Sequence, residues 1–399
     1  MKRLIKNIGM LATPIGSCEV TILKDAHLIC EDGKIAAIGT GDCPDIDAIC
    51  VDAEGKLVTP GLIDAHTHLV FGGWREHELI MKRQGVPYLE ILAKGGGILS
   101  TVRKTREASF EELLEKAKEA LSEMLSLGVT TCEAKSGYGL DVETERKQLR
   151  VTKKLNEIQP VELISTYLGA PAVPTEYQTD REGYLRLMEE LMPQIAEEKL
   201  AEFCDVFCET GVFSAEEAER ILKAAQKCGL KVKMHADEIN PIGGTEVAGR
   251  LGATSVEHLI AATDDGIEAM KQGGSVAVLL PATSFYLNKP YARARNMMAA
   301  GVPVAVASDF NPGSCPSLNL QFVMNLACWN YGLSPEEVLC AVTRNAAAAV
   351  CRADRIGTLE VGKQADIVIW DAPNLDYIFY RFGQNLVKTV IKDCKIVKG

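Results

Sequence analysis

Short apolar runs rich in β-branched residues alternate with longer amphipathic stretches along most of the chain after residue 60. A buried strand is a short apolar run, whereas an amphipathic helix repeats its apolar positions every three to four residues, so this alternation predicts strands and helices in turn. The predicted strands cover residues 62–68, 129–134, 162–168, 203–208, 231–236, 254–258, 275–280 and 303–308. The clearest predicted helices cover residues 109–127, 143–159, 181–198, 215–228 and 240–251.

Local signals support this order of elements. Two of the predicted helices begin with a capping box, in which Ser109 is followed by Glu112 and Ser214 by Glu217. Eight strands that alternate with helices predict an α/β fold, a (β/α)8 TIM barrel over residues 60–356. An open doubly wound sheet is the alternative, but the glycine run 95–97 does not match the dinucleotide-binding pattern expected of that fold.

The two ends of the chain have a different pattern. Residues 1–59 contain short β-like runs separated by turn signals, such as Asp32-Gly33 and Glu54-Gly55, and residues 362–370 and 387–397 are also strand-like. Neither end is long enough to bury a core by itself. We therefore expect residues 1–59 and 357–399 to form one small β-sandwich domain beside the barrel.

Composition narrows the class of protein further. The chain has 399 residues, 47% of them hydrophobic and 24% charged, with a formal net charge of −11, which argues against nucleic acid or an anionic membrane as a partner. No apolar run is long enough for a membrane span, and no signal peptide is evident, so we expect a cytoplasmic protein. The thirteen cysteines include no CxxC pair, and we expect buried thiols, not disulfides or structural zinc.

Histidines follow several of the predicted strands. His66 and His68 end the first apolar run, and their i, i+2 spacing places both imidazoles on one face of a strand. Four of the six histidines, these two with His235 and His258, close strand-like segments, and Asp309 does the same. Barrel enzymes carry their chemistry at the carboxyl ends of the strands, and imidazole and carboxylate are good ligands for divalent metals. The pattern therefore predicts a metal-dependent hydrolase.

These motifs resemble the amidohydrolase superfamily and, within it, the imidazolonepropionase family of histidine degradation. The resemblance extends over nearly the whole chain and is carried by Thr59–Gly73, Gly95–Arg103, Glu133–Gly139, His235–Glu238 and Ser308–Gly313. The first of these blocks is typical of the whole superfamily, and the other four are particular to imidazolonepropionases.

The resemblance implies one divalent metal ion, zinc or iron. It assigns His66, His68, His235 and Asp309 as the metal ligands, and His258 as a residue that hydrogen-bonds the water that the metal activates. The fourth strand segment, 203–208, ends without the lysine that bridges two metals in binuclear members, which favours a mononuclear site. His258, Glu238 and Asp309 are the expected catalytic residues, with His258 favoured as the general base.

The resemblance also implies a small anionic heterocyclic substrate with a propionate tail, and a homodimer. Arginine suits a carboxylate because its planar guanidinium pairs with it in bidentate geometry, and Arg75 occupies the matching position. Glu238 is expected to hydrogen-bond a ring nitrogen and move a proton there. The full set of expected substrate-binding residues is Arg75, Tyr88, Tyr138, Glu238, Asn311, Gly313 and Ser314. Trp74 and His77 lie near Arg75 in sequence and are further candidates.

One position departs from the family pattern. Pro171 stands where imidazolonepropionases have a histidine that contacts the ring, and proline offers no side-chain donor or acceptor. The main hypothesis is hydrolysis of the ring C–N bond of 4-imidazolone-5-propanoate to N-formimidoyl-L-glutamate. The alternative is an amidohydrolase or deaminase that acts on a related nitrogen heterocycle, and a deaminase would release ammonia. A catalytically inactive barrel that serves as a scaffold is a third hypothesis, which the intact ligand set disfavours.

Overall fold

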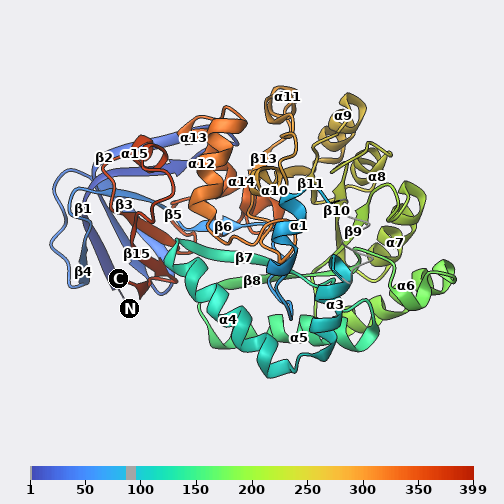
Figure 1. The fold of residues 1–399 in the computed structure, drawn as a ribbon. Coiled ribbons are helices and arrows are strands. Elements are labelled where there is room, and N and C mark those ends of the chain that lie inside the picture. The colour runs from blue at the N-terminus through green and yellow to red at the C-terminus, as the bar shows by residue number, and fades with distance from the viewer. Residues whose placement is uncertain (1, 87–95) are drawn as a thin grey trace.

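A parallel eight-stranded sheet forms the larger part of the molecule. The computed structural model describes residues 2–86 and 96–399. The parallel strands are hydrogen-bonded in chain order, and they are β6 (Leu62–Asp64), β7 (Val129–Lys135), β8 (Glu162–Ala170), β9 (Phe203–Cys208), β10 (Lys231–Ala236), β11 (Ser255–His258), β12 (Val276–Leu279) and β13 (Val304–Val306). Figure 1 shows this sheet curved into a barrel with helices around its outside.

The first and last strands close the barrel at the level of the motif histidines. Thr67 forms an isolated parallel bridge with Phe310, the Asp309 amide donates to the His66 carbonyl at 3.0 Å, and the His68 amide donates to the Phe310 carbonyl at 2.9 Å. The prediction of a strand over 62–68 is therefore wrong in its end, because β6 stops at Asp64 and the following residues pair with the segment after β13.

Helices cover the outer face of the barrel and fill the loops. They are α1 (Leu79–Arg83), α3 (Ile98–Glu107), α4 (Phe110–Ser126), α5 (Val142–Ile158), α6 (Arg181–Glu197), α7 (Ala215–Lys227), α8 (Gly244–Arg250), α9 (Asp264–Gly273), α10 (Pro281–Leu287), α11 (Ala294–Ala300), α12 (Leu320–Asn330), α13 (Pro335–Ala341) and α14 (Arg344–Ala349), with the 3₁₀ turns η1 (Glu76–Glu78) and η2 (Thr175–Tyr177). Both predicted capping boxes, at Ser109 and Ser214, are present. Helix α8 begins at Gly244, not at residue 240, because Gly243 has a φ of +89°, a left-handed conformation that precedes the helix.

A second eight-stranded sheet is built from both ends of the chain. Its strands are β1 (Lys2–Pro14), β2 (Val20–Glu31), β3 (Lys34–Thr40), β4 (Ile49–Asp52), β5 (Leu57–Pro60), β14 (Ile367–Trp370), β15 (Val387–Lys392) and β16 (Lys395–Lys398), and α15 (Leu375–Tyr380) packs nearby. Strand β5 pairs with β1 on one side and β14 on the other, so it joins the two ends of the chain. The predicted (β/α)8 TIM barrel with a small β-sandwich domain from both termini is confirmed.

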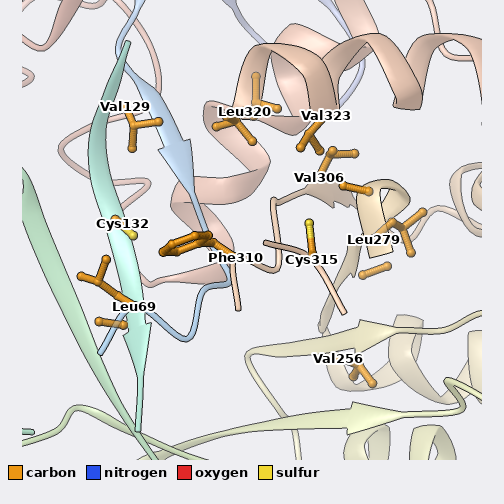
Figure 2. Packing of buried hydrophobic residues seen from close by; sticks show 14 of the residues in the cluster. Leu69, Val129, Cys132, Val256, Leu279, Val306, Phe310, Cys315, Leu320 and Val323 are labelled. Carbon is orange, nitrogen blue, oxygen red and sulfur yellow. The ribbon is translucent and has the colours of Figure 1, made fainter. Parts of the chain in front are cut away.

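The largest cluster of buried apolar side chains joins barrel strands to the helices around them, and a smaller cluster joins the barrel strands to α14. Figure 2 shows Phe310 between Cys132 of β7 and Cys315, with Leu320 and Val323 of α12 above them. Phe310 is 2% exposed, so the segment that carries Asp309 is held by a ring locked in the core.

The expectation of buried thiols is met at Cys132, Cys204 and Cys208. No helix within residues 2–86 and 96–399 has both the length and the apolar character that a membrane span requires.

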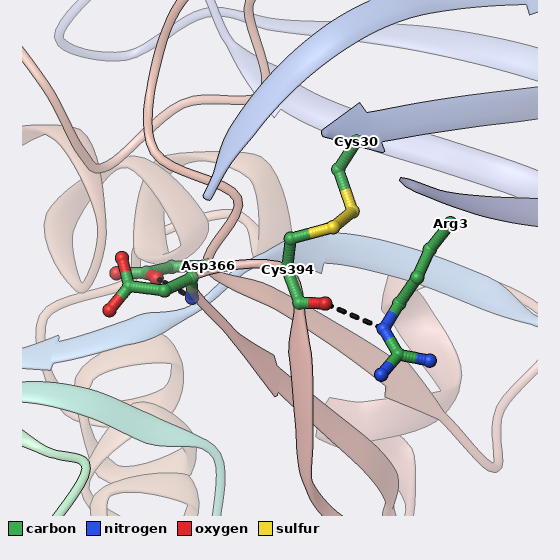
Figure 3. The surroundings of a disulfide bond; sticks show 5 residues. Arg3, Cys30, Asp366 and Cys394 are labelled. Carbon is green, nitrogen blue, oxygen red and sulfur yellow. Dashed lines mark hydrogen bonds between the residues drawn. A yellow bond between two sulfur atoms is a disulfide. The ribbon is translucent and has the colours of Figure 1, made fainter. Parts of the chain in front are cut away.

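One pair of cysteines contradicts the expectation of thiols alone. Cys30 on β2 and Cys394 between β15 and β16 form a disulfide, and the Arg3 side chain donates to the Cys394 carbonyl beside it at 2.6 Å (Figure 3). The two residues are 364 positions apart in the chain, with their Cα atoms 5.8 Å apart in the small domain. The pairing could not be foreseen, because only the assembled sheet brings the two ends of the chain together.

Loss of this disulfide is expected to destabilise the small domain. A bond that closes so long a loop restricts the unfolded chain, and removing such a bond costs about 2–4 kcal/mol of unfolding free energy. The Cys30→Ala/Cys394→Ala double variant should therefore unfold at a lower urea concentration than the parent. Cys18→Ala, at an exposed free thiol, is the matched control. If reduction and the double substitution both leave the urea midpoint unchanged, the disulfide contributes nothing to stability.

Candidate metal centre and active site

Three histidines from two strand ends meet at the mouth of the barrel. His66 and His68 follow β6, and His235 lies on β10; their ring centroids are 4.6 Å apart for His66 and His235 and 5.5 Å apart for His68 and His235. One ligand atom from each of the three lies within 4.8 Å of the other two. Asp309 Oδ1 lies 3.5 Å from Nε2 of both His66 and His68. The structure thus brings all four predicted metal ligands together.

The chemistry of this group fits a divalent cation. Burial lowers the pKa of both His66 and His68 well below the ordinary value, so both imidazoles are neutral and have lone pairs to offer. Neither ring nitrogen of His66, a fully buried residue, has a hydrogen-bond partner within the described part of the chain. Buried polar nitrogens without partners are costly, and a metal ion held by these residues would satisfy them.

The backbone is strained where two of the site residues stand. His258 has a φ of +71° and Asp309 a φ of +56°, in the left-handed region that residues with a Cβ rarely adopt. Each such residue costs on the order of 1–3 kcal/mol and persists only where the surrounding structure fixes it. His258 is the last residue of β11, and Asp309 lies three residues after the end of β13.

Two side chains bond the Asp309 carboxylate, and a third residue fixes the backbone beside it. Its Oδ2 accepts from the Thr283 hydroxyl at 2.5 Å and its Oδ1 from the Asn311 amide at 3.0 Å. Asp64, at the end of β6, accepts from the Ser308 amide at 3.0 Å, and burial raises the pKa of Asp64 to about 7. These contacts fix the carboxylate beside the histidines, so little conformational freedom is lost when it binds a cation.

His235 has a carboxylate partner on the neighbouring strand. Its Nδ1 lies 2.9 Å from Asp205 Oδ2 on β9, and both residues are buried. Burial acts to lower the pKa of His235, but Asp205 raises it above the ordinary value and keeps the proton on Nδ1. With Nδ1 beside the Asp205 carboxylate, Nε2 is the nitrogen left to bind a metal, the arrangement by which outer carboxylates orient histidine ligands.

Charged residues fill the barrel interior beneath the metal centre, and the sequence analysis missed them. Glu133 and Lys135 lie two residues apart on β7, so they share one face of the strand. Lys233 lies on β10, two residues before His235, and Glu257 lies on β11. The side chains of all four have no exposed surface. The signal was present in the sequence: charged residues at a spacing of two within otherwise apolar strands indicate a shared, inward-facing polar side.

His258 and Glu238 face each other beside the metal centre. His258 Nε2 lies 3.7 Å from Glu238 Oε2. Burial lowers the pKa of His258 to about 4 and raises the pKa of Glu238 to about 7. At neutral pH the pair therefore combines an imidazole free to accept a proton with a carboxyl group able to hold one.

The metal centre opens into a cavity of about 200 Å³. Most of the predicted site residues line it: His68, Arg75, Tyr138, His235, Glu238, His258, Asp309, Asn311 and Ser314, together with Pro171, Gly137, Leu168, Phe207 and Ile98. Gly313 does not line the cavity but lies against Arg75, because a Cβ on it would stand 1.1 Å from Arg75 Nη2. Tyr88 and Gly95 lie outside the described residues.

Arg75 is mostly buried and is supported from the loop after β6. Its side chain is 11% exposed, and its Nε lies 3.8 Å from Oε1 of the buried Glu78. Glu78 also pairs with Lys82 at 3.0 Å, and the Lys82 ammonium donates to the Gly313 carbonyl at 2.9 Å. Because two cations surround one carboxylate, this corner of the cavity has a surplus of positive charge and suits an anionic group.

Tyr138 is presented by a loop that α5 holds. The Glu145 carboxylate accepts from the backbone amides of Gly137, Gly139 and Leu140 at 2.8–3.1 Å, and Gln148 accepts from the Tyr138 amide at 3.2 Å. Burial raises the pKa of Glu145 to about 7. These contacts place the Tyr138 ring 5.9 Å from the His68 ring.

Trp74 and His77, the further candidates near Arg75, are placed elsewhere. Trp74 lines a neighbouring cavity with Phe71 and Lys116, whose ammonium stands 3.7 Å from the Phe71 ring centroid. His77 lies in η1 and does not line the cavity at the metal centre.

A (β/α)8 barrel with three clustered histidines and an aspartate at the carboxyl ends of its strands defines a metal-dependent hydrolase. The sequence model of the Amidohydrolase family matches residues 57–397. An imidazolonepropionase of Streptococcus gordonii is 54% identical over 386 residues, covering 95% of this chain and 91% of its own. One of Fusobacterium nucleatum is 51% identical over 405 residues, covering 98% and 97%. The chain belongs to the amidohydrolase family and, within it, to the imidazolonepropionases.

Solved structures with far lower identity share the fold. An adenosine deaminase of Xanthomonas campestris with bound zinc has a TM-score of 0.74 at 20% identity, covering 99% of this chain and 92% of its own. A 5-methylcytosine deaminase of Klebsiella pneumoniae has a TM-score of 0.76 at 19% identity, covering 100% and 98%. At these identities the likeness establishes the barrel with its second domain and nothing about the substrate.

Proposed function

We propose that the chain hydrolyses the ring C–N bond of 4-imidazolone-5-propanoate and yields N-formimidoyl-L-glutamate, a step of histidine degradation. The observation that carries the proposal is one cavity with the metal-ligand cluster at its base and a buried arginine on its wall. Relatives named imidazolonepropionase, at about half identity over nearly the full chain, support the same reaction.

His66, His68, His235 and Asp309 are proposed to hold one divalent ion, zinc or iron. When bound, such an ion lowers the pKa of a water molecule to about 7 and polarises a carbonyl oxygen. Imidazole and carboxylate suit both metals, so the ligand set does not choose between them.

The remaining site residues bind the substrate and move protons. Arg75 pairs with the propionate carboxylate, and Asn311, Ser314 and Tyr138 line the walls around the ring, while Gly313 leaves room for the guanidinium. Tyr88 is retained as a proposed substrate contact on the resemblance alone. The orientation of the ring follows from the two ends of the cavity: the charged tail lies at Arg75, and the ring carbonyl faces His235 and Asp309.

Proton transfer is assigned to His258 and Glu238. His258 accepts a proton from the attacking water, and Glu238 donates one to the ring nitrogen as its bond to the carbonyl carbon breaks. The water oxygen becomes part of the new carboxylate, and both ring nitrogens stay in the product, so no ammonia leaves. Asp309 keeps its carboxylate on the metal side, because Thr283 and Asn311 hold both of its oxygens.

The proposal is tested with freshly prepared 4-imidazolone-5-propanoate and purified, metal-analysed protein. Rapid loss of the imidazolone absorbance without release of ammonia is the expected result. Loss of absorbance together with ammonia would instead indicate the deaminase alternative. No turnover by protein that carries its metal would overturn the assignment of this substrate.

The pH dependence of kcat/KM should report the two proton-transfer residues. The pKa of His258 is lowered to about 4, so the base is free above that pH; the pKa of Glu238 is raised to about 7, so the acid holds its proton below that pH. We expect kcat/KM to rise through about 4 and to fall as pH increases through about 7. Glu238→Gln should be slower and lack the alkaline fall. An unchanged alkaline limb in Glu238→Gln would contradict this role.

Pro171 lines the cavity where the family pattern has a histidine. We expect Pro171→His to raise kcat/KM for 4-imidazolone-5-propanoate, because an imidazole there adds a hydrogen-bonding partner for the ring that proline lacks. Thr175→His, at an exposed position that follows the same loop and does not line the cavity, is the control. Unchanged or lower kcat/KM in Pro171→His would mean that other residues already satisfy the ring.

We further propose a cytoplasmic homodimer, with domains at residues 1–59 plus 357–399 and at residues 60–356. Large apolar side chains on the surface support self-association: Trp329 is 75% exposed, Tyr380 80% and Phe382 66%. The net charge of −11 disfavours nucleic acid and anionic membranes as partners. Sedimentation at several concentrations tests the dimer, and a monomer at all of them would overturn it.

A further inference from the structure

The charged residues beneath the metal centre converge on one ammonium group. Lys135 Nζ lies 2.7 Å from Asp205 Oδ2, 3.1 Å from Glu133 Oε2 and 4.0 Å from Glu257 Oε1. All four side chains have no exposed surface. Burying a cation is costly unless it is paired, and here three carboxyl groups from three strands surround it.

Asp205 connects this ammonium to the metal centre. Its Oδ2 contacts both Lys135 Nζ and, at 2.9 Å, His235 Nδ1, so one oxygen stands between the two groups. Its Oδ1 accepts from the His235 backbone amide at 3.2 Å and from the Val206 amide at 2.7 Å. Lys135 therefore fixes the carboxylate that fixes the imidazole of a metal ligand.

The same carboxylates are arranged as a second set of metal ligands. One atom each from Asp205, His235 and Glu257 lies within 4.8 Å of the others, and all three residues are buried. Glu257 Oε2 is fully buried and has no hydrogen-bond partner in the described ranges 2–86 and 96–399. Lys233, the other buried ammonium nearby, pairs with Glu133 at 2.9 Å. Of these two buried lysines, Lys135 pairs with Asp205, and Lys233 pairs with Glu133.

We propose that Lys135 is a built-in cation that holds Asp205 against His235 and fills the place where Asp205, His235 and Glu257 would otherwise bind a second divalent ion. The centre then holds a single metal because a protein ammonium occupies the second position. Without that charge, Asp205 and Glu257 would face each other in a dry interior, and a divalent cation would neutralise them. This inference concerns the metal centre alone and does not depend on which ring is hydrolysed.

The test is the zinc content of the full-length protein after dialysis against buffered free zinc. We expect about one zinc per chain in the parent and about two in Lys135→Met, which keeps the length of the side chain and removes its charge. Thermal unfolding of Lys135→Met should then shift upward with added zinc beyond the shift in the parent, since a ligand that binds the folded state stabilises it.

Three further variants make the result specific. Lys233→Met removes a buried ammonium from the same interior but not from Asp205, and should keep one zinc. Lys135→Arg retains the charge and should also keep one. The Lys135→Met/Asp205→Asn double variant removes a ligand of the second site and should return to one. One zinc in Lys135→Met, with no extra zinc-dependent shift, would overturn the proposal, as would two zinc ions in Lys233→Met.

If Lys135→Met does not fold, a separate measurement tests whether Asp205 positions His235. Asp205→Asn leaves Lys135 in place and weakens the partner of His235 Nδ1, so its first zinc should bind about 10–100-fold more weakly in competition with a chelator. Unchanged zinc affinity in Asp205→Asn would show that the Lys135–Asp205 pair does not position the ligand, and would overturn the proposal by this second route.

Discussion

Replacement of His258 by asparagine is expected to lower kcat about 10²–10⁴-fold, the contribution of a well-placed general base. The variant should nevertheless retain its metal. His258 stands outside the buried group formed by His66, His68 and His235, and its Nε2 faces Glu238 instead. On the proposed assignment, His258 transfers a proton and the four other residues hold the metal, so the metal should stay bound in the variant.

The measurement is kcat together with the metal content of the same preparation. His235→Asn is the matched control, because it changes the neighbouring imidazole, 5.2 Å away between ring centroids, to the same side chain. That control should lose metal and activity together. Loss of metal from His258→Asn as well would make His258 a ligand and would require another general base.

Replacement of Arg75 by methionine is expected to lower kcat/KM by about 30–1,000-fold, equivalent to about 2–4 kcal/mol for removing the partner of a buried charge. The loss should appear mainly in KM, because Arg75 binds the tail of the substrate and not the reacting bond. The guanidinium is almost fully enclosed between Glu78 and the Gly313 backbone, so water cannot easily replace it.

A substrate without the carboxylate tail makes this prediction specific. With a methyl-substituted imidazolone, the parent and Arg75→Met should differ little, because the interaction that was removed has no counterpart in that compound. Arg83→Met, an exposed arginine at the end of α1, should behave as the parent with both compounds. An equal loss with the tailless compound would mean that Arg75 supports the fold of the site and not recognition of the anion.

The number and order of the barrel strands could be predicted from sequence, because each strand is a local apolar run with its own turn signals. The predicted first and last residues of the strands and helices were less accurate than their number and order. Strand β6 was predicted to reach His68 and ends at Asp64, since His66 and His68 take backbone partners from the segment after β13. Hydrogen bonds that come from 240 residues further along the chain leave no mark in the local pattern.

The positions of the candidate metal ligands in the chain could also be predicted. The charged side chains that surround them in the barrel could not. His235 lies near the end of its strand, and His66, His68 and Asp309 follow shortly after the ends of theirs. In a parallel barrel all carboxyl ends of the strands meet at one face. The contact of Asp205 with His235 depends on the register of β9 against β10. Its contact with Lys135 depends on the alignment of β7, β8 and β9, since β8 lies between the other two strands. The spacing of Glu133 and Lys135 indicates a shared polar side of β7, but it does not indicate that Lys135 pairs with Asp205, which lies 70 residues further along the chain on β9.

Periodicity and motif spacing are local properties of the chain, so the sequence alone was sufficient to predict the barrel, the candidate metal ligands and the family. The folded structure was needed to find the Cys30–Cys394 disulfide, the enclosure of Arg75 by Glu78 and Gly313, and the buried Lys135 ammonium beneath the candidate metal centre. Each of these joins residues far apart in the chain. Their proximity is set by strand register and packing, which are properties of the whole fold and not of any segment.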